Sequence, residues 1–163
     1  KRPFEKELTL NRYTYSTKEV SPDTFKLETD LTVEREFVKI GGFRAFKIPF
    51  FQEIVSFERF PKQDRNFPLN YWEYEPVDRY EETMEVSLPE GYRFEDLPES
   101  MEISSPFITY TVEIQSVDDR HITVKRVALP NRSTFASDSY EAFRTIVKQI
   151  QEMEEAYLTY RAN

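Results

Sequence analysis

The sequence predicts a mainly β (α+β) fold: an antiparallel β-sheet or β-sandwich with one C-terminal amphipathic helix packed on it. Aromatic residues are abundant, with 14 Phe and 10 Tyr among 163 residues, and they favour half-buried strands. Apolar and polar residues alternate along most of the chain, which indicates strands with one buried face. After residue 138 the apolar spacing changes to that of a helix.

The first two strands are expected over residues 5–15 and 25–37, joined by a turn at Ser21-Pro22-Asp23. The apolar parity changes within the first of them, which predicts a bulge around Asn11-Arg12. A short connection makes antiparallel pairing the simplest arrangement for the two strands.

A bend at Gly41-Gly42 leads into the next predicted strands, Phe46 to Phe50 and Ile54 to Phe60. The segment Pro61 to Asn70 has proline near both ends and no periodicity, so it is expected to be an extended connector. The length suits a single β-rich domain over residues 1–163, with residues 61–70 as the best candidate for an internal boundary.

The clearest strand precedes a turn at Pro89-Glu90-Gly91. One of its faces carries the apolar residues Tyr80, Met84, Val86 and Leu88, and the other is polar. Glu82 interrupts the apolar face, and we interpret it as the sign of an open strand end. Proline ends the strand because it cannot donate to a ladder, and glycine tolerates the conformation with which the chain leaves the turn.

A β-hairpin and a helix complete the predicted fold. The hairpin has one strand over Ile103 to Ile114, a turn at residues 117–120, and a bulge near Lys125-Arg126 where the apolar parity changes. The helix is expected from about Asp138 to Tyr157, and its apolar stripe comprises Tyr140, Phe143, Ile146, Val147, Ile150 and Met153. Asp138 and Glu141 have the spacing of a capping box.

Composition excludes several classes of function. A formal charge of −8 opposes binding to nucleic acid or to an anionic membrane surface. No apolar run approaches the roughly 20 residues that a membrane span requires. The absence of cysteine removes thiolate nucleophiles and thiolate metal ligands, and three glycines leave no phosphate-binding loop. We therefore expect no cofactor.

Candidate chemistry is sparse. His121, the only histidine, lies beside Asp118 and Asp119, a grouping that suits a general base or a metal ligand, but the run is also typical of a turn, which we prefer. No second histidine completes a zinc site, so no metal site is expected. A carboxylate pair of the glycosidase type could be formed by two of the residues Glu73, Glu75, Glu81 and Glu82. A strand face exposed to solvent explains these acidic residues equally well. No catalytic residue is predicted.

Trp72 and Tyr74 are the predicted ligand-binding residues. They would share one face of a strand beside acidic side chains, as in a platform that stacks against sugar rings. The alternative is that this face belongs to the core, where aromatic residues are more common.

Residues 65–163 resemble the C-terminal accessory domain, a domain of unknown function, of large bacterial transglutaminase-like multidomain proteins. The similarity runs from Phe67-Pro68-Leu69 through YEETMEVSLPEGYRFEDLPES to SYEAFRTIVKQI. The resemblance implies an accessory β-domain exported to the periplasm or cell surface of a Gram-negative bacterium. In such proteins a Cys, His and Asp set in the core carries the chemistry, and no catalytic residue transfers to this cysteine-free chain.

The leading hypothesis is thus a non-catalytic accessory or interaction domain, whose partner is the adjacent catalytic domain of the same polypeptide and whose ligands are protein or glycan. Two alternatives stay open. One is a carbohydrate-binding module that uses Trp72 and Tyr74, and the other is a carboxylate-based glycoside hydrolase.

Overall fold

The computed structural model of the chain describes residues 8–16, 26–33, 37–62, 65–70 and 78–163. It confirms the predicted class, with antiparallel sheets and one α-helix near the C-terminal end. The chain divides into two compact units, Lys1–Phe37 and Val38–Asn163, which are described separately. The boundary expected near residues 61–70 lies inside the second unit, and the single-domain organisation stays a prediction.

The first unit contains an antiparallel pair, β1 (Leu8–Ser16) and β2 (Lys26–Val33). The register shifts between Leu10 and Arg12, which confirms the predicted bulge. The predicted turn at residues 21–23 lies outside the described residues.

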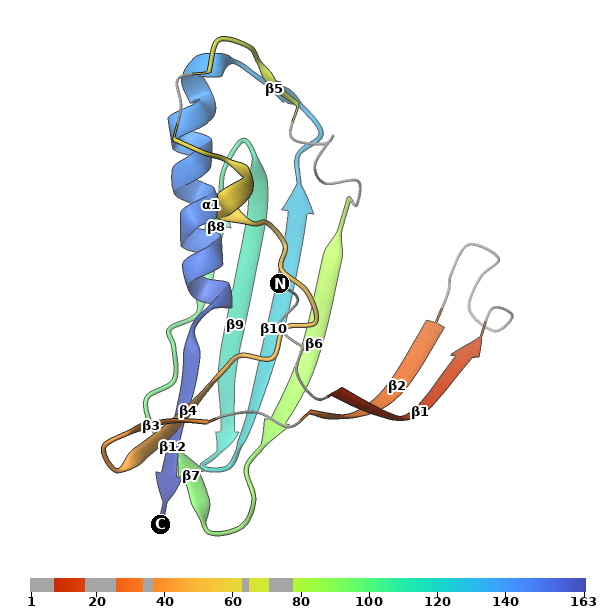
Figure 1. Ribbon diagram of the computed structural model, residues 1–163, viewed down its shortest axis with the longest axis vertical. Coiled ribbons are helices and arrows are strands. Elements are labelled where there is room, and N and C mark those ends of the chain that lie inside the picture. Colours follow the sequence, from red (N-terminus) through yellow and green to blue (C-terminus); the bar gives the residue numbers. More distant parts are fainter. Residues whose placement is uncertain (1–7, 17–25, 34–36, 63–64, 71–77) are drawn as a thin grey trace. The chain divides into compact units, whose positions relative to one another are not determined.

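The main sheet of the second unit has the order β6-β10-β9-β8, and every neighbouring pair is antiparallel. Its strands are β6 (Tyr80–Ser87), β8 (Met101–Ser104), β9 (Ile108–Asp118) and β10 (His121–Pro130). The helix α1 (Tyr140–Glu154) lies along one face of this sheet (Figure 1). The core forms between them, since buried residues of β9, β10 and α1 belong to one apolar cluster.

Helix α1 is docked as its apolar stripe predicts. Five of the six stripe residues are buried and Ile146 is half-buried. The ring of Phe143 makes edge-to-face contacts with Phe60 and Phe107, with centroids 4.8 and 5.4 Å away. Such contacts add to the free energy gained by removing the ring from water.

The predicted ends of the helix are wrong. A short 3-10 helix (Ser137–Ser139) precedes α1, and Ser139 is the N-cap with no side-chain capping hydrogen bond. Asp138 instead accepts a hydrogen bond from the Ser139 hydroxyl at 3.2 Å, so the predicted capping box does not form. The helix ends at Glu154 because the chain enters a further strand, β12 (Tyr157–Ala162).

Strand β12 belongs to a second sheet of order β3-β4-β12-β7, with β3 (Val38–Ile40), β4 (Phe43–Lys47) and β7 (Tyr92–Phe94). All three pairings are antiparallel. Figure 1 shows the chain passing directly from α1 into β12. Strand β12 therefore joins β4, near the start of this unit, to β7, near its middle.

The segment after β4 also differs from the prediction. Strand β4 ends at Lys47, and the predicted strand over residues 54–60 is replaced by a 3-10 helix (Phe57–Arg59). Ile54 and Phe60 are nevertheless buried, because the segment packs into the core without pairing as a strand. Two short strands, β5 (Leu69–Asn70) and β11 (Thr134–Phe135), form an antiparallel pair. Strand β5 follows this segment in the chain, and β11 precedes α1.

The turn at Gly91 and the register of β10 test two remaining predictions. Gly91 has a φ of +85°, a conformation that side-chain-bearing residues rarely adopt, so its predicted backbone role is confirmed. The predicted bulge near Lys125-Arg126 is wrong, because the register of β10 shifts between His121 and Ile122 instead. Residues 122, 124, 126 and 128 all face the core, so Arg126 is a charged residue at a core-facing position.

Candidate functional site

Arg126 is the centre of a buried network of charged side chains. It is 2% exposed and lies directly opposite Glu82 on the neighbouring strand. Its Nη2 donates to Glu82 Oε2 at 2.6 Å, and its Nη1 donates to Glu154 Oε1 at 2.7 Å. The guanidinium also lies 4.2 Å from the ring centroid of Phe50. One cation thus serves two carboxylates beneath an aromatic ring.

Glu154 is the deeper of the two carboxylates, with 4% of its side chain exposed against 21% for Glu82. It accepts hydrogen bonds from the Tyr110 hydroxyl at 3.3 Å and from the Ile54 N–H at 3.1 Å. Burial raises the pKa of Glu154 to about 7, although Arg126 and the Ile54 N–H oppose the increase. Burial and the nearby Glu154 charge also raise the pKa of Tyr110.

The same network fixes the segment that follows β4. Glu82 Oε1 accepts from the Phe51 N–H at 2.9 Å, and Arg126 Nη1 donates to the Gln52 carbonyl at 3.0 Å. Together with the bond from Ile54 to Glu154, these contacts tie three consecutive parts of an irregular segment to the sheet and helix. The segment makes no strand ladder, so side chains satisfy its backbone groups.

A perturbed carboxyl pKa is a signal of catalysis only where a substrate can reach the group. The Glu154 carboxylate is nearly inaccessible, and its oxygens are occupied by Arg126, Tyr110 and Ile54. The network therefore has the properties of a structural element rather than of a catalytic centre.

His121 begins β10 directly after the predicted turn. Its Nδ1 lies 2.7 Å from Asp118 Oδ1, and the same carboxylate accepts from the backbone N–H groups of Arg120 and His121 at 2.7 and 2.9 Å. The hydrogen bond from the Arg120 backbone, followed by that from the His121 side chain, lowers the pKa of Asp118. Both side chains are substantially exposed, so these contacts close the turn at the surface.

The described carboxylates of the predicted glycosidase pair do not converge. Glu81 faces outward from β6, where it accepts from Arg79 Nη2 at 2.6 Å, while Glu82 faces inward to Arg126. Hydrogen bonding to Arg79 lowers the pKa of Glu81. Glu73, Glu75, Trp72 and Tyr74 lie outside the described residues, so the predicted aromatic platform stays a prediction.

The second sheet exposes an apolar surface that we call the outer patch, formed by Val38, Phe43 and Tyr157. These side chains are 44%, 40% and 43% exposed. Val38 is directly opposite Ala45, and Tyr157 is opposite Lys47, which places all of them on the same face of the sheet. Ala45 is only 1% exposed at its centre.

Charged side chains border the outer patch. The guanidinium of Arg161 lies 5.9 Å from the ring centroid of Phe43, and both Arg161 and Arg93 pair with Glu95. At the other end Lys47 Nζ lies 3.6 Å from Glu155 Oε1. An apolar centre with a charged border is the usual anatomy of a protein interface.

Sequence reasoning missed the buried network, strand β12 and the outer patch. The signal for the buried network was available, because Glu82 and Arg126 each interrupt an apolar parity with charges of opposite sign. The signal for β12 was the alternation of Leu158, Tyr160 and Ala162 after the helical stripe. The outer patch depends on the pairing of β3 with β4 and of β4 with β12, and no local pattern reveals the pairing of β4 with β12.

Other site types find no support in the part of the chain that the structure describes. No group of three or more acidic or histidine side chains there is arranged to hold a metal ion. None of the helices in the described ranges combines the length and apolar character needed to cross a membrane.

Comparison with known proteins gives a family without an assigned function. Neither the curated proteins nor the solved structures provide a match. The family model of DUF3858, described as a domain of unknown function, matches residues 42–159. The matched region spans β4 through the first half of β12, including the buried network and α1. The chain therefore belongs to the DUF3858 family of domains of unknown function.

Proposed function

We propose that this chain is a non-catalytic accessory domain that uses the outer patch to pack against an adjacent domain of a larger bacterial polypeptide. The adjacent domain is a transglutaminase-like or protease-like core, and the polypeptide is exported to the periplasm or cell surface. The exposure of Val38, Phe43 and Tyr157 together on one sheet face is the observation that carries the proposal.

The physical argument is that the outer patch leaves clustered apolar side chains exposed to solvent. Single exposed apolar residues are ordinary, but a cluster of them with a charged border marks an interaction surface. Tyrosine and phenylalanine are effective anchors because a ring buries a large area while few rotatable bonds become fixed. The border residues Arg161 and Glu95 are placed to exclude water from such contacts.

The nature of the partner rests on the sequence resemblance to transglutaminase-like proteins. A role without catalysis is supported by the lack of cysteine in the sequence and by the engagement of its only histidine with Asp118. The acid with a pKa near 7, Glu154, is sealed within the core. We therefore expect the chain alone to show no transglutaminase, peptidase or glycosidase turnover.

The test uses the neighbouring domain encoded in the same reading frame, produced separately and mixed with this chain. Sedimentation velocity should detect a complex, and the double variant Phe43→Ser, Tyr157→Ser should weaken it at least roughly tenfold, as loss of interface anchors does. Phe67→Ser is the matched control, because Phe67 is 77% exposed and lies outside the outer patch. A complex that tolerates the double variant as well as it tolerates the control would contradict the proposal.

A further inference from the structure

Two positively charged side chains, Lys39 and Arg44, are neighbours on the second sheet. Lys39 of β3 lies directly opposite Arg44 of β4, so the two positive side chains share one face. Like charges in this arrangement destabilise a sheet. In the part of the chain that the structure describes, neither side chain forms an ion pair with a carboxylate, so this repulsion is not neutralised there.

The aromatic residue Tyr92 completes this arrangement. Arg44 packs against Tyr92 of β7, with its guanidinium carbon 5.6 Å from the ring centroid. Tyr92 in turn contacts Tyr160 of the intervening strand edge to face, with centroids 5.7 Å apart. The contact with Tyr92 holds the Arg44 guanidinium, which has no carboxylate partner among the residues that the structure describes. This face is opposite to the one that carries the outer patch.

Beyond Tyr92 the surface is hollowed. An open depression of about 410 Å³ lies between β7 and the turn of the β9-β10 hairpin, lined by Tyr92, Arg93, Asp118, Asp119, Arg120 and Asn163. The turn is fixed against β7 by the bond from the Phe94 N–H to the Asp119 carbonyl at 2.8 Å. Arg120 brings a third cation that has no ion pair among the described residues.

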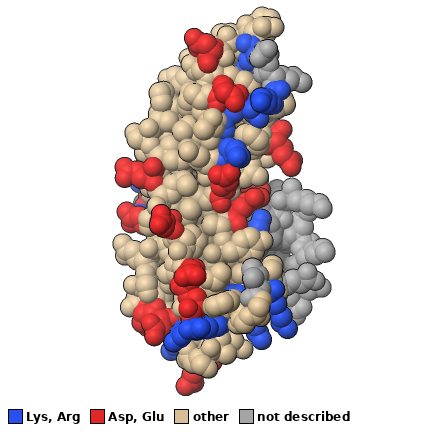
Figure 2. All heavy atoms as spheres, turned by 90° about the vertical axis from the view of Figure 1, so that its left-hand side faces the viewer, with Lys and Arg blue, Asp and Glu red and all other residues tan. Residues whose placement is uncertain are grey.

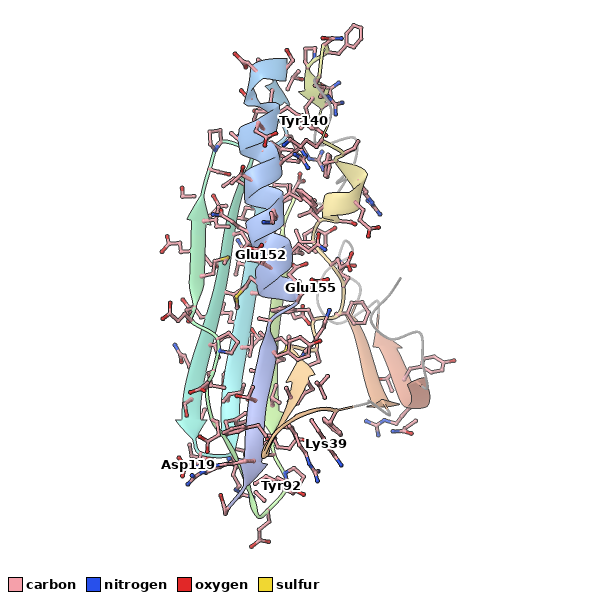
Figure 3. The ribbon with its side chains drawn as sticks, turned by 60° about the vertical axis from the view of Figure 1, so that its left-hand side comes forward. Lys39, Tyr92, Asp119, Tyr140, Glu152 and Glu155 are labelled. Carbon is pink, nitrogen blue, oxygen red and sulfur yellow. The ribbon has the colours of Figure 1, made fainter. Side chains whose placement is uncertain are left out.

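The local charges favour an anion in spite of the acidic chain. Asp118 is engaged by His121 and by two backbone N–H groups. Asp119 also lines the depression, and no such contact is described for its carboxylate. Its negative charge therefore opposes an anion. Figure 3 places Lys39, Tyr92 and Asp119 at the same end of the unit, and Figure 2 shows Lys and Arg side chains among acidic ones near the lower end of the view.

We propose that Lys39, Arg44, Tyr92 and Arg120 form a binding site for an acidic peptide segment of a partner protein. From β3 to β7 the site crosses four strands, or about 14 Å at the usual strand separation, which is too wide for one small ion to contact both ends. An extended segment of roughly five residues covers this width. The net charge of −8 disfavours long polyanions, so specificity comes from these short-range contacts.

The site goes beyond the proposed packing on an adjacent domain and is tested without that domain. The probe is an acetylated peptide of five glutamates, and its matched control is the same peptide built from glutamine. Amide chemical shifts recorded during titration should move at Tyr92 and Arg120 with the glutamate peptide, and the affinity should fall as salt is raised. Arg44→Gln and Arg120→Gln should each weaken binding roughly tenfold, as loss of a charge-assisted contact does.

Two further variants sharpen the test. Asp119→Asn removes the opposing charge and should strengthen binding, a gain that damage to the fold would not produce. Lys148→Gln is the matched control, because Lys148 is an exposed helix cation paired with Glu152 and should have no effect. Equal binding of the two peptides, shifts confined to other residues, or binding of inorganic phosphate without the glutamate peptide would each overturn the proposal.

Discussion

Arg126 and Glu154 should respond in opposite ways when their charges are removed, because one buried cation serves two carboxylates. Arg126→Met keeps much of the side-chain volume but leaves Glu82 and Glu154 without their cation. Breaking a buried ion pair in this way costs about 3–5 kcal/mol. Glu154→Gln instead leaves Arg126 paired with Glu82, so the interior stays neutral.

The pKa of Glu154 sets the magnitude for the second variant. The pKa rises from 4.5 to about 7 on folding, and at 1.36 kcal/mol per pKa unit ionisation of Glu154 reduces stability by about 3 kcal/mol above pH 7. Since the folded pKa is raised, the favourable contribution is complete below pH 4.5 and is lost as the pH increases through 7. Relative to the parent, Glu154→Gln should therefore gain about 3 kcal/mol over this range.

The assay is urea unfolding followed by circular dichroism at several values between pH 4.5 and pH 8. Asp118 and Glu81 have lowered pKa values and give stability that is lost on acidification, but they are present in both proteins and cancel in the difference. Loss of an acceptor for the Ile54 N–H adds an offset that does not depend on pH. A difference that is flat with pH, or an Arg126→Met variant within about 1 kcal/mol of the parent, would refute the charge argument.

Three further predictions follow from the sequence and fold. Phe143→Asp should cost several kcal/mol in thermal or urea unfolding because the ring is buried, while the exposed helix substitution Gln149→Asp should cost little. Gly91→Val should lower stability by about 1–2 kcal/mol because φ is positive there; an unchanged melting temperature would show an ordinary turn. Replacing Trp72 and Tyr74 together with Ala should abolish glycan binding with little effect on melting if they form a platform, whereas a core location predicts unfolding.

Patterns confined to one element were sufficient for much of the fold. Alternation along β6 and the three- and four-residue spacing of α1 follow directly from the geometry of a strand and a helix. The apolar face of β6 is half-buried against an exposed polar face, and most of the apolar stripe of α1 is buried. The bulge in β1 was visible as a change of parity because an inserted residue reverses the side to which later side chains point.

Features that depend on two distant segments were missed. A bulge was predicted near Lys125-Arg126 because the apolar parity changes there to Val127 and Leu129. Glu82, the partner of Arg126, is 44 residues away, and only the register of β6 with β10 brings them opposite each other. The helix was predicted to extend to Tyr157 because apolar spacing within a helix does not show where a following strand begins. The helix ends earlier because β12 pairs with β4 and β7.

Side-chain accessibility in the full-length polypeptide tests the central claim most directly. Hydroxyl-radical footprinting would compare oxidation of Phe43 and Tyr157 in the isolated chain with oxidation of the same residues when the neighbouring domain is attached. Phe67, exposed elsewhere on the chain, serves as the internal reference. An interaction domain that uses the outer patch predicts that both residues become protected while Phe67 does not. Equal oxidation of Phe43 and Tyr157 in the two proteins would contradict the account.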